Sequence, residues 1–441
     1  MSEEPNSLRD EFERIGAWIQ AYFDHPECYR VMPAVRPGDV AAALPAEAPE
    51  LGEPFEEILT DFERIIVPAT THWNHPRFFA YFATSAAPAA IAAEALAATL
   101  DVKAMLWRTS PAATELEQVT MRWLGRLLGL PAQWMGVIYD TASIAGFTAL
   151  AAAREALNLG IREHGMAGRS LPALRIYITG ETHSHVEKAA IALGLGQRNV
   201  VRVPCDEAFR MRADQLRACI EADLRHGALP LAVVATVGTT STTSIDPVRE
   251  IAAVAREHGV WLHVDAAYAG IAAIIPEFRG LLDGVELADS LVVNPHKWMF
   301  VPMDLSVLFL KDEAMVRRAF SLVPEYLTTP ETDAVNYMDY GLQLGRRFRA
   351  LKLWFVLRNL GAQEIREKLR GHIALAQEFA AWLGAEPRWE ILAPHPFSVV
   401  CFRYVPPGLD EAALEARNAS IMHAVNATGE VFISNTKIED R

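Results

Sequence analysis

The chain has 441 residues, of which 51% are apolar and 22% charged, and this composition excludes collagen-like and disordered proteins. Its formal net charge of −14 disfavours nucleic acid and anionic membranes as partners. The longest apolar stretch, residues 86–100, contains Glu94 and is too short to span a bilayer, so we expect a buried helix there. The acidic start is unlike a signal peptide, and the four scattered cysteines form no CxxC pair. We therefore expect a soluble, cytoplasmic protein.

The first 84 residues are predicted to be mainly helical. Apolar residues recur at helical spacing between Leu8 and Tyr22, and Ser7 with Asp10 makes a capping box in front of them. A second helix is expected over residues 55–66. The apolar stripe of the first helix must be covered, either by a partner subunit or by the chain's own body, and the pattern does not decide between them.

From about residue 135, short β-branched runs alternate with helical stretches. Strands are expected at residues 136–139, 175–179, 231–237, 260–264, 291–293 and 306–310, with helices at 144–157 and 186–193. Asp246 and Pro247 are expected to open a further helix as its N-cap and first turn, and Gly259 to end it. This alternation predicts an α/β fold with a mostly parallel sheet flanked by helices.

After Gly345 the pattern changes to that of a small α+β domain. It consists of a helical region at 346–385, strands near 399–404 and 431–434, and a helix at 411–425. Three parts of the chain are expected, namely an N-terminal helical segment (1–84), a large α/β domain (85–345) and a small C-terminal domain (346–441).

Lys297 follows the expected strand 291–293, in the motif NPHKW that starts at Asn294. A buried ammonium is costly, and the neutral amine is a nucleophile that can form a Schiff base. Asp265 also ends an apolar strand, where an acid could keep the pyridine nitrogen of pyridoxal 5′-phosphate (PLP) protonated. Ala267 is small enough for a flat ring to lie against the backbone. The alternatives are a surface or ion-paired lysine and a helix N-cap aspartate.

Polar residues follow three other expected strands. Residues 141–143 precede a helix, where N–H groups and hydroxyls can bind a phosphate or simply cap the helix. His183 could stack on a cofactor ring and transfer protons, whereas a metal site shared with His185 lacks a third ligand. Hydroxyls at 239–241 end another strand. Together these groups predict one crevice at the carboxyl ends of the strands, whereas GLG at 194–196 lacks the third glycine of a dinucleotide loop.

These motifs resemble those of the group II PLP-dependent amino-acid decarboxylases, most closely the aromatic-L-amino-acid decarboxylases. The resemblance runs from about Leu8 to the C-terminus. It is carried by HWNHPRFFAYF, SPAATELE, THSHVEKA, GTTSTTSID, WLHVDAAYAG, NPHKW and GRRFRALKLWFVLR, and the spacing of HVDAAYAG and NPHKW is its most specific part. It implies a PLP-dependent transferase fold of type I.

The resemblance also implies roles for individual residues. Lys297 binds the cofactor covalently, Asp265 contacts the pyridine nitrogen and His183 stacks on the ring. The remaining cofactor contacts fall to Thr141, Ala142, Ser143, Thr240, Ala267, Asn294 and His296. The substrate pocket is lined by Trp73, Tyr81, Phe82 and Thr84 and, from the partner subunit of a homodimer with shared active sites, by Lys103 and Met105. The N-terminal helices pack on the partner.

Tyr337 lies in the irregular stretch 321–343, which is expected to be functional or mobile. Counting back from GRRFR, the resemblance places Tyr337 on the family's loop tyrosine, which protonates the substrate's Cα after carbon dioxide leaves. Tyr340 is close enough to be confused with it.

The sequence departs from the family pattern in three places. Asp140 stands where glycine is common, and it adds charge beside the expected phosphate. Lys103 and Met105 replace the apolar and aromatic residues of the animal aromatic decarboxylases. The family usually continues with another strand and helix, so the small C-terminal domain is expected to be truncated.

The sequence thus predicts decarboxylation of an aromatic L-amino acid to its amine and carbon dioxide, with PLP and no metal. One alternative is oxidative decarboxylation to an aldehyde, against which His183 and Tyr337 argue. A second is a non-catalytic PLP-binding homodimer. A nicotinamide dehydrogenase is a distant third because the glycine fingerprint is missing.

Overall fold

The computed structural model describes residues 7–82, 85–322, 331 and 333–438. By its internal contacts the chain forms two units, residues 84–407 with 438–440, and residues 1–83 with 408–437 and 441. Helix α14, Glu411–Ala427, thus groups with the N-terminal segment. This division differs from the three parts expected from the sequence, whose boundaries stay a prediction.

The larger unit contains a seven-stranded sheet in the order β1-β7-β6-β5-β4-β2-β3. Its strands are β1 (Met135–Tyr139), β2 (Leu174–Ile178), β3 (Val200–Arg202), β4 (Leu229–Thr236), β5 (Trp261–Asp265), β6 (Ser290–Val293) and β7 (Ser306–Leu310). Strand β7 runs antiparallel to both β1 and β6, and the remaining pairs are parallel. The predicted α/β class is confirmed, with one reversed strand making the sheet mixed. Strands buried on both faces explain the nearly continuous apolar runs in the sequence.

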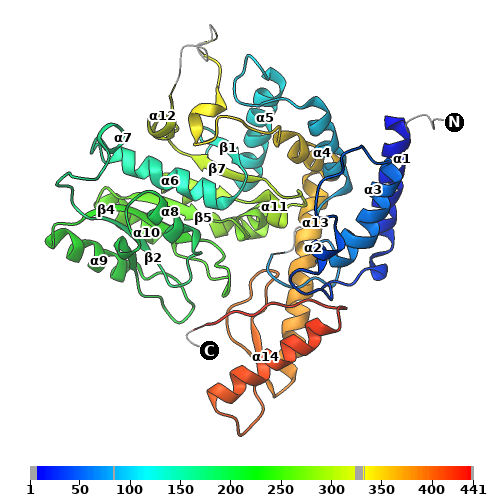
Figure 1. Ribbon diagram of the computed structural model, residues 1–441. Helices are drawn as coiled ribbons and strands as arrows, with labels where there is room; N and C mark the ends of the chain where they lie inside the picture. The colour runs from blue at the N-terminus through cyan, green and yellow to red at the C-terminus, as the bar shows by residue number, and fades with distance from the viewer. Residues whose placement is uncertain (1–6, 83–84, 323–330, 332, 439–441) are drawn as a thin grey trace. The chain divides into compact units, whose positions relative to one another are not determined.

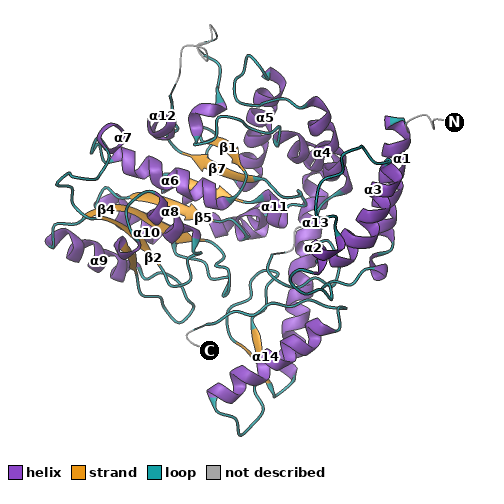
Figure 2. Ribbon diagram, in the orientation of Figure 1, coloured by secondary structure: helices purple, strands orange, loops and turns teal. Residues whose placement is uncertain are grey.

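Helices flank this sheet, as Figures 1 and 2 show. Helix α6 (Ala142–Ala156) packs on strands β4 to β7 and contacts α8 (His185–Ala192) and α12 (Ala314–Phe320). Many of its buried residues are alanines, and because their side chains are short the helix can lie close to the sheet. Helices α9 (Ala213–Arg225) and α10 (Val248–Glu257) contact each other and β4.

A second group of helices packs around α13 (Ala350–Ala385), which contacts α4 (Pro88–Leu100) and α5 (Pro111–Leu128). Backbone torsions leave the helical region within α13 at Gly361, where φ is 68°. Among the residues that the structure describes, the shorter helical turns of this unit are α7 (Ile161–His164), η4 (Gln197–Asn199), η5 (Ala269–Ile274), η6 (Pro276–Leu282), η7 (Val285–Leu287), α11 (Pro295–Trp298) and η9 (Tyr337–Tyr340).

Two local predictions for this unit are wrong. Helix α4 exists, but only Ala90 and Ala93 are buried in it, because it uses one narrow side for packing. Asp246 is not the N-cap of α10, a position that Pro247 takes. The Asp246 carboxylate instead accepts the N–H groups of Met211 (2.6 Å) and Thr236 (2.8 Å), and burial raises its pKa to about 6.

After α13, strands β8 (Trp389–Ile391) and β9 (Phe402–Tyr404) form a two-stranded antiparallel sheet. The strand predicted at 399–404 is therefore confirmed in its second half. The strand predicted at 431–434 is wrong, because this segment makes only an isolated bridge between Phe432 and Phe78 within the smaller unit.

The smaller unit begins with α1 (Leu8–Asp24), whose predicted capping box of Ser7 and Asp10 is confirmed. It continues with η1 (Pro26–Cys28), α2 (Asp39–Ala43), α3 (Phe55–Asp61), η2 (Phe62–Ile66) and η3 (Val67–Ala69), and it ends with α14. No residue of α1 is buried, and Leu8 remains 69% exposed. Throughout the described chain, every helix is too short or too polar to cross a membrane.

Candidate active site

The parallel strands β4, β5 and β6 end side by side at one edge of the sheet. In their registers Thr236 lies opposite Asp265, and Asp265 opposite Val292. Beyond the strands, the Asn294 N–H donates to the Ala267 carbonyl at 3.1 Å. Asp265, Ala267 and the NPHKW segment are therefore brought to the same edge, which is where open α/β sheets bind ligands.

Asp265 is a buried carboxylate, 4% exposed, at the end of β5. Its Oδ1 accepts the Ala267 N–H at 3.1 Å, and its Oδ2 lies 3.9 Å from His185 Nδ1. Burial acts to raise the pKa of Asp265, but the neighbouring His185 and Lys297 act in the opposite direction and outweigh it, so the pKa falls below its ordinary value. The next helical turn has Tyr268 as its N-cap, so Asp265 does not serve as a helix cap.

Lys297 lies on the short helix α11, which begins directly beyond β6. Its backbone N–H donates to the Asn294 carbonyl at 2.9 Å, which fixes the turn that carries the side chain. Burial lowers the pKa of the Lys297 ammonium, and the carboxylate of Asp265 opposes that shift. The amine is therefore more easily deprotonated than that of a surface lysine, as a nucleophilic lysine requires.

Two side chains of the same segment have polar atoms available to a ligand. Burial and the charge of Lys297 lower the pKa of His296 to about 4, so its ring is neutral at pH 7. His296 Nδ1 accepts the Leu305 N–H at 3.0 Å, which leaves the ring proton on Nε2 as a donor. The Oδ1 atom of Asn294 is buried and has no hydrogen-bond partner within the described chain.

Helix α6 begins at the end of β1, with Thr141 as its N-cap. The first N–H groups of a helix have no intrahelical acceptor, and those of Ala142 and Ser143 are in this position. Asp140 takes the neighbouring Thr141 N–H on its Oδ1 at 2.6 Å, and its Oδ2 accepts from Gln343 at 3.4 Å. The acidic departure noted in the sequence thus competes for one N–H of this turn.

His183 and His185 lie at the start of α8, with their Nδ1 atoms 3.2 Å apart. His183 is exposed, whereas His185 is buried and contacts Asp265. Burial lowers the pKa of both rings, and Asp265 acts in the opposite direction on each. The sequence singled out His185 only as a possible metal ligand, and its contact with Asp265 was missed. Within the described residues no group of three His, Cys, Asp or Glu side chains could hold a metal ion.

Thr240 lies in the turn after β4 and is exposed. The end of β4 lies opposite Asp265, so the turn belongs to the same edge of the sheet. No contact in the described chain places the Thr240 side chain against Asp265. The hydroxyl of Thr236, at the last position of β4, is instead buried without a partner in that part of the chain.

The predicted substrate-binding residues are divided between the two units. In the smaller unit, Trp73 and Tyr81 are exposed and stacked, with ring centroids 5.7 Å apart, and Phe82 is half-buried. Thr84 lies outside the described residues. In the larger unit, Lys103 is exposed and Met105 half-buried.

Tyr337 is part of η9 and is 2% exposed, in a cluster that includes Tyr139 and Tyr340. Its ring centroid lies 4.5 Å from Cζ of Arg346, and its hydroxyl has no partner in the described chain. Burial raises its pKa well above the ordinary value, and Glu117 adds to this shift. The expected mobility is wrong for this residue, because it is packed in the core. No contact in the described chain joins it to Lys297 or His183, and its catalytic role stays a prediction.

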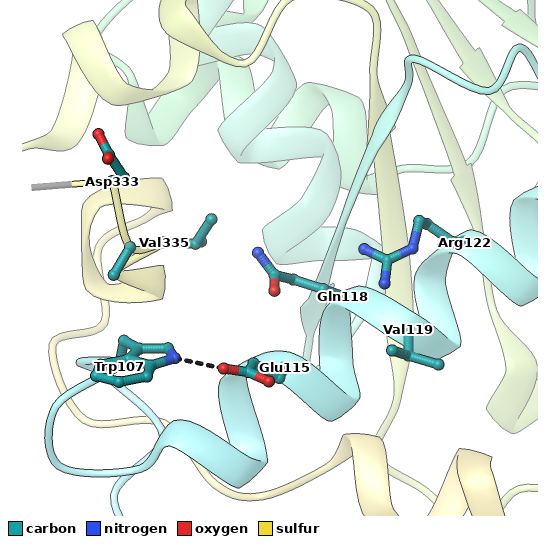
Figure 3. A pocket seen from close by; sticks show the side chains of 8 residues that line it. Trp107, Glu115, Gln118, Val119, Arg122, Asp333 and Val335 are labelled. Carbon is teal, nitrogen blue, oxygen red and sulfur yellow. Dashed lines mark hydrogen bonds between the residues drawn. The ribbon is translucent and has the colours of Figure 1, made fainter. Parts of the chain in front are cut away.

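A pocket of about 250 Å³ elsewhere in the larger unit is lined by Trp107, by residues of α5 including Arg122, and by Asp333 (Figure 3). Two of the lining side chains are joined by a hydrogen bond, which the Trp107 indole donates to Glu115 at 2.8 Å (Figure 3). None of the predicted site residues lines this pocket, and it contains no lysine or histidine.

The groups at the strand edge fit PLP. Lys297 offers an amine of lowered pKa and Asp265 a buried carboxylate. Asn294 offers a buried Oδ1 without a partner in the described chain, His296 an Nε2–H, and the first turn of α6 the N–H groups of Ala142 and Ser143. This is the donor and acceptor set that an aldehyde, a pyridine nitrogen and a phosphate need.

Comparison with known proteins leads to the same cofactor. The pyridoxal-dependent decarboxylase conserved domain matches residues 37–405. Tyrosine decarboxylase 4 of Petroselinum crispum is 38% identical over 98% of this chain and 87% of its own length, and a phenylacetaldehyde synthase of Arabidopsis thaliana is 38% identical over 96% and 88%. A crystal structure of Oryza sativa TDC with PLP and tryptamine superposes with a TM-score of 0.94 at 34% identity, over 100% of this chain and 93% of the other. The chain belongs to the pyridoxal-dependent decarboxylase family.

Proposed function

We propose that the strand-edge site around Lys297 decarboxylates an aromatic L-amino acid to the corresponding amine and carbon dioxide. The observation that carries the proposal is the pair of Asp265 and Lys297, which lie beyond neighbouring strands and perturb each other's pKa. The enzyme is a PLP-dependent carboxy-lyase, and relatives of similar length act on tyrosine or, in the case of the aldehyde synthase, form phenylacetaldehyde.

Different residues at the site would bind different parts of the cofactor. Lys297 would bind it covalently through Nζ, and Asp265 would hold a proton on the pyridine nitrogen. Thr141, Ala142, Ser143, Asn294 and His296 would bind the phosphate through N–H groups and side-chain atoms. Ala267 and His183 would lie against the two faces of the ring, with Thr240 near its hydroxyl.

The chemistry that PLP supplies when bound is a ring that accepts the electron pair left behind when carbon dioxide departs. The protein's own part is to orient the substrate so that the bond to its carboxylate is the one that breaks. Trp73, Tyr81, Phe82 and Thr84, together with Lys103 and Met105 from a partner subunit, would surround the side chain. A proton must then reach Cα, and His183 and Tyr337 are the groups proposed to deliver it.

Shared active sites require a homodimer, and the exposed apolar side chains of the N-terminal helices support one. Leu8 and Phe12 on α1 are 69% and 49% exposed, and Ile58 on α3 is 50% exposed. Large apolar residues concentrated on helices that bury little of themselves are typical of interfaces. A cytoplasmic location is part of the proposal, supported by four cysteines that are all free thiols.

The test is a product analysis of purified, PLP-saturated protein. Carbon dioxide release would be measured with tryptophan, 5-hydroxytryptophan, DOPA, tyrosine, phenylalanine and histidine. We expect release from at least one aromatic substrate with an equal amount of amine. Aldehyde with ammonia and hydrogen peroxide would instead identify an aldehyde synthase, and PLP binding without carbon dioxide release would identify a non-catalytic scaffold.

A further inference from the structure

His185 is buried between two groups of the proposed cofactor site. It is 3% exposed, and its Nδ1 lies 3.2 Å from His183 Nδ1 and 3.9 Å from Asp265 Oδ2. One nitrogen atom therefore stands between the residue proposed to stack on the ring and the residue proposed to hold the pyridine proton. A position this close to two functional groups is unusual for a side chain that only fills space.

The hydrogen bonds around these rings determine where the protons are. The backbone N–H of His185 donates to His183 Nδ1 at 3.2 Å, so that atom is an acceptor and the His183 ring proton is on Nε2. In the contact between the two Nδ1 atoms, His185 must then be the donor. Its Nδ1–H donates to His183 Nδ1, and Oδ2 of Asp265 lies 3.9 Å from the same nitrogen, too far for a hydrogen bond but close enough for the carboxylate charge to attract the N–H group.

The other nitrogen of His185 agrees with this assignment. Nε2 is buried without a partner in the described chain. It packs against Gly146 of α6 so closely that a Cβ atom added there would lie 2.6 Å from it. A buried N–H without an acceptor costs more than an unused lone pair, so the single proton of the neutral ring belongs on Nδ1.

We propose that His185 is a positioning residue whose Nδ1–H is hydrogen-bonded to His183 and lies beside the carboxylate of Asp265, and that this link fixes both groups for the cofactor. The inference rests on the proposed PLP site. It assigns His185 no contact with substrate or cofactor, because its action passes through the two neighbours. The link holds the Asp265 carboxylate in its charged, oriented form and leaves Nε2–H of His183 free as a proton donor.

The test measures the dissociation constant of PLP from apoprotein by fluorescence titration, so turnover is not needed. Asn places an amide nitrogen near the Nδ1 position of histidine, Gln places one near Nε2, and Leu has neither. His185→Asn should therefore bind PLP nearly as tightly as the wild type. His185→Gln and His185→Leu should bind about ten-fold more weakly, because they lose the hydrogen bond to His183 and the N–H group beside Asp265.

His263 provides a matched control. It is completely buried on β5, it also influences the pKa of Asp265, and its Nε2 has no partner among the described residues. Its Nδ1, however, contacts Ser290 Oγ at 2.9 Å rather than His183. His263→Asn and His263→Gln should therefore bind PLP equally well, whereas the His185 pair should differ.

Several outcomes would overturn the inference. Wild-type affinity in His185→Gln and His185→Leu would show that Nδ1 is not needed. Equal weakening in all three His185 variants, with equally lowered unfolding midpoints, would show that the ring only fills space. If wild-type apoprotein binds no PLP at all, the proposed cofactor site fails first, so the two failures can be told apart.

Discussion

In the larger unit, Arg346 and Glu117 are buried about as deeply as Asp265, but their charges are paired within the chain. The Arg346 guanidinium donates to both carboxylate oxygens of Glu117 and to the carbonyls of Ala104 and Ile138. The Ile138 N–H also donates to Glu117. At the strand edge, by contrast, Asp265 stands 3.9 Å from His185, and Asn294 keeps a buried oxygen without a partner in the described chain.

The difference separates a cluster that holds the fold from one that is built for a ligand. A buried charge whose hydrogen bonds are all made joins the elements that supply them, here α5, β1 and the segment before α13. A buried polar group left unpaired by the chain is costly, and at the strand edge a bound ligand would supply the missing partner. Removing a group should therefore affect stability in the first cluster and chemistry in the second.

The largest effect is expected for Lys297→Ala, which removes the amine that binds PLP covalently. Turnover should be undetectable, while the unfolding midpoint of the apoprotein stays close to that of the wild type. Borohydride treatment of PLP-loaded wild type should fix the cofactor to the peptide that contains Lys297. Lys352 is the matched control, since it is 1% exposed but pairs with Glu94, and it should remain unlabelled. Label on Lys352 would show that a buried, ion-paired lysine also reacts with PLP, and it would contradict the contrast between paired groups and those built for a ligand.

Glu117→Gln should destabilise the fold more than any change at the strand edge. Breaking one side of a buried ion pair costs about 3–5 kcal/mol, because the remaining charge is left without its partner. Urea unfolding followed by circular dichroism would measure the loss. Asp214→Asn, which breaks an exposed pair with Arg212, is the control and should leave the midpoint unchanged. An equal midpoint in both variants would contradict the structural role of the Arg346 cluster.

Asp265→Asn should give the opposite pattern, with a normal unfolding midpoint and poor turnover. Loss of a preorganised charge at a reacting centre lowers kcat by about 10²–10³-fold. Asp265 also raises the pKa of Lys297, so removing its charge should lower that pKa further and shift the reaction of apoprotein with PLP to lower pH. Unchanged kcat, or a shift to higher pH, would contradict the assignment.

The sheet and the Lys297–Asp265 edge could be predicted because their signals are local in sequence. Buried strands are short β-branched runs, and a polar residue directly after such a run has to lie at the strand's end. The α4 prediction failed because apolar composition shows that a segment can be buried and not that a partner covers it. The N-cap prediction for Asp246 failed for a related reason, since an aspartate before proline can serve either as a helix cap or as a buried hydrogen-bond acceptor.

The sequence pattern could not predict contacts between segments that are far apart in the chain. The contact between His185 and Asp265 joins α8 to β5 across 80 positions, and nothing in the sequence around either residue indicates that it contacts the other. The stretch 321–343 was expected to be functional or mobile because it lacks periodicity, and Tyr337 and Tyr340 are buried in η9. A single buried turn is too short to produce a periodic pattern, so its packing can be seen only in three dimensions.

The smallest effect on stability is expected for Tyr337→Phe, a residue that packs with the first cluster but is proposed to act at the second. The family resemblance assigns Tyr337 to the catalytic edge, but its ring packs on Arg346, and its hydroxyl has no partner in the described chain. Removing a hydroxyl that makes no hydrogen bond should change stability by less than about 1 kcal/mol. As a proposed proton donor, Tyr337 should nevertheless be needed for amine formation, so Tyr337→Phe should still release carbon dioxide but give aldehyde and hydrogen peroxide in place of amine. Amine formed at the wild-type rate would contradict the role and would agree with the packing of Tyr337 in the core. The other two tyrosines of the stretch 321–343 are Tyr340 and Tyr326, the latter outside the described residues. Tyr340→Phe and Tyr326→Phe are therefore the comparison variants, and the one that loses amine but still releases carbon dioxide would identify the donor.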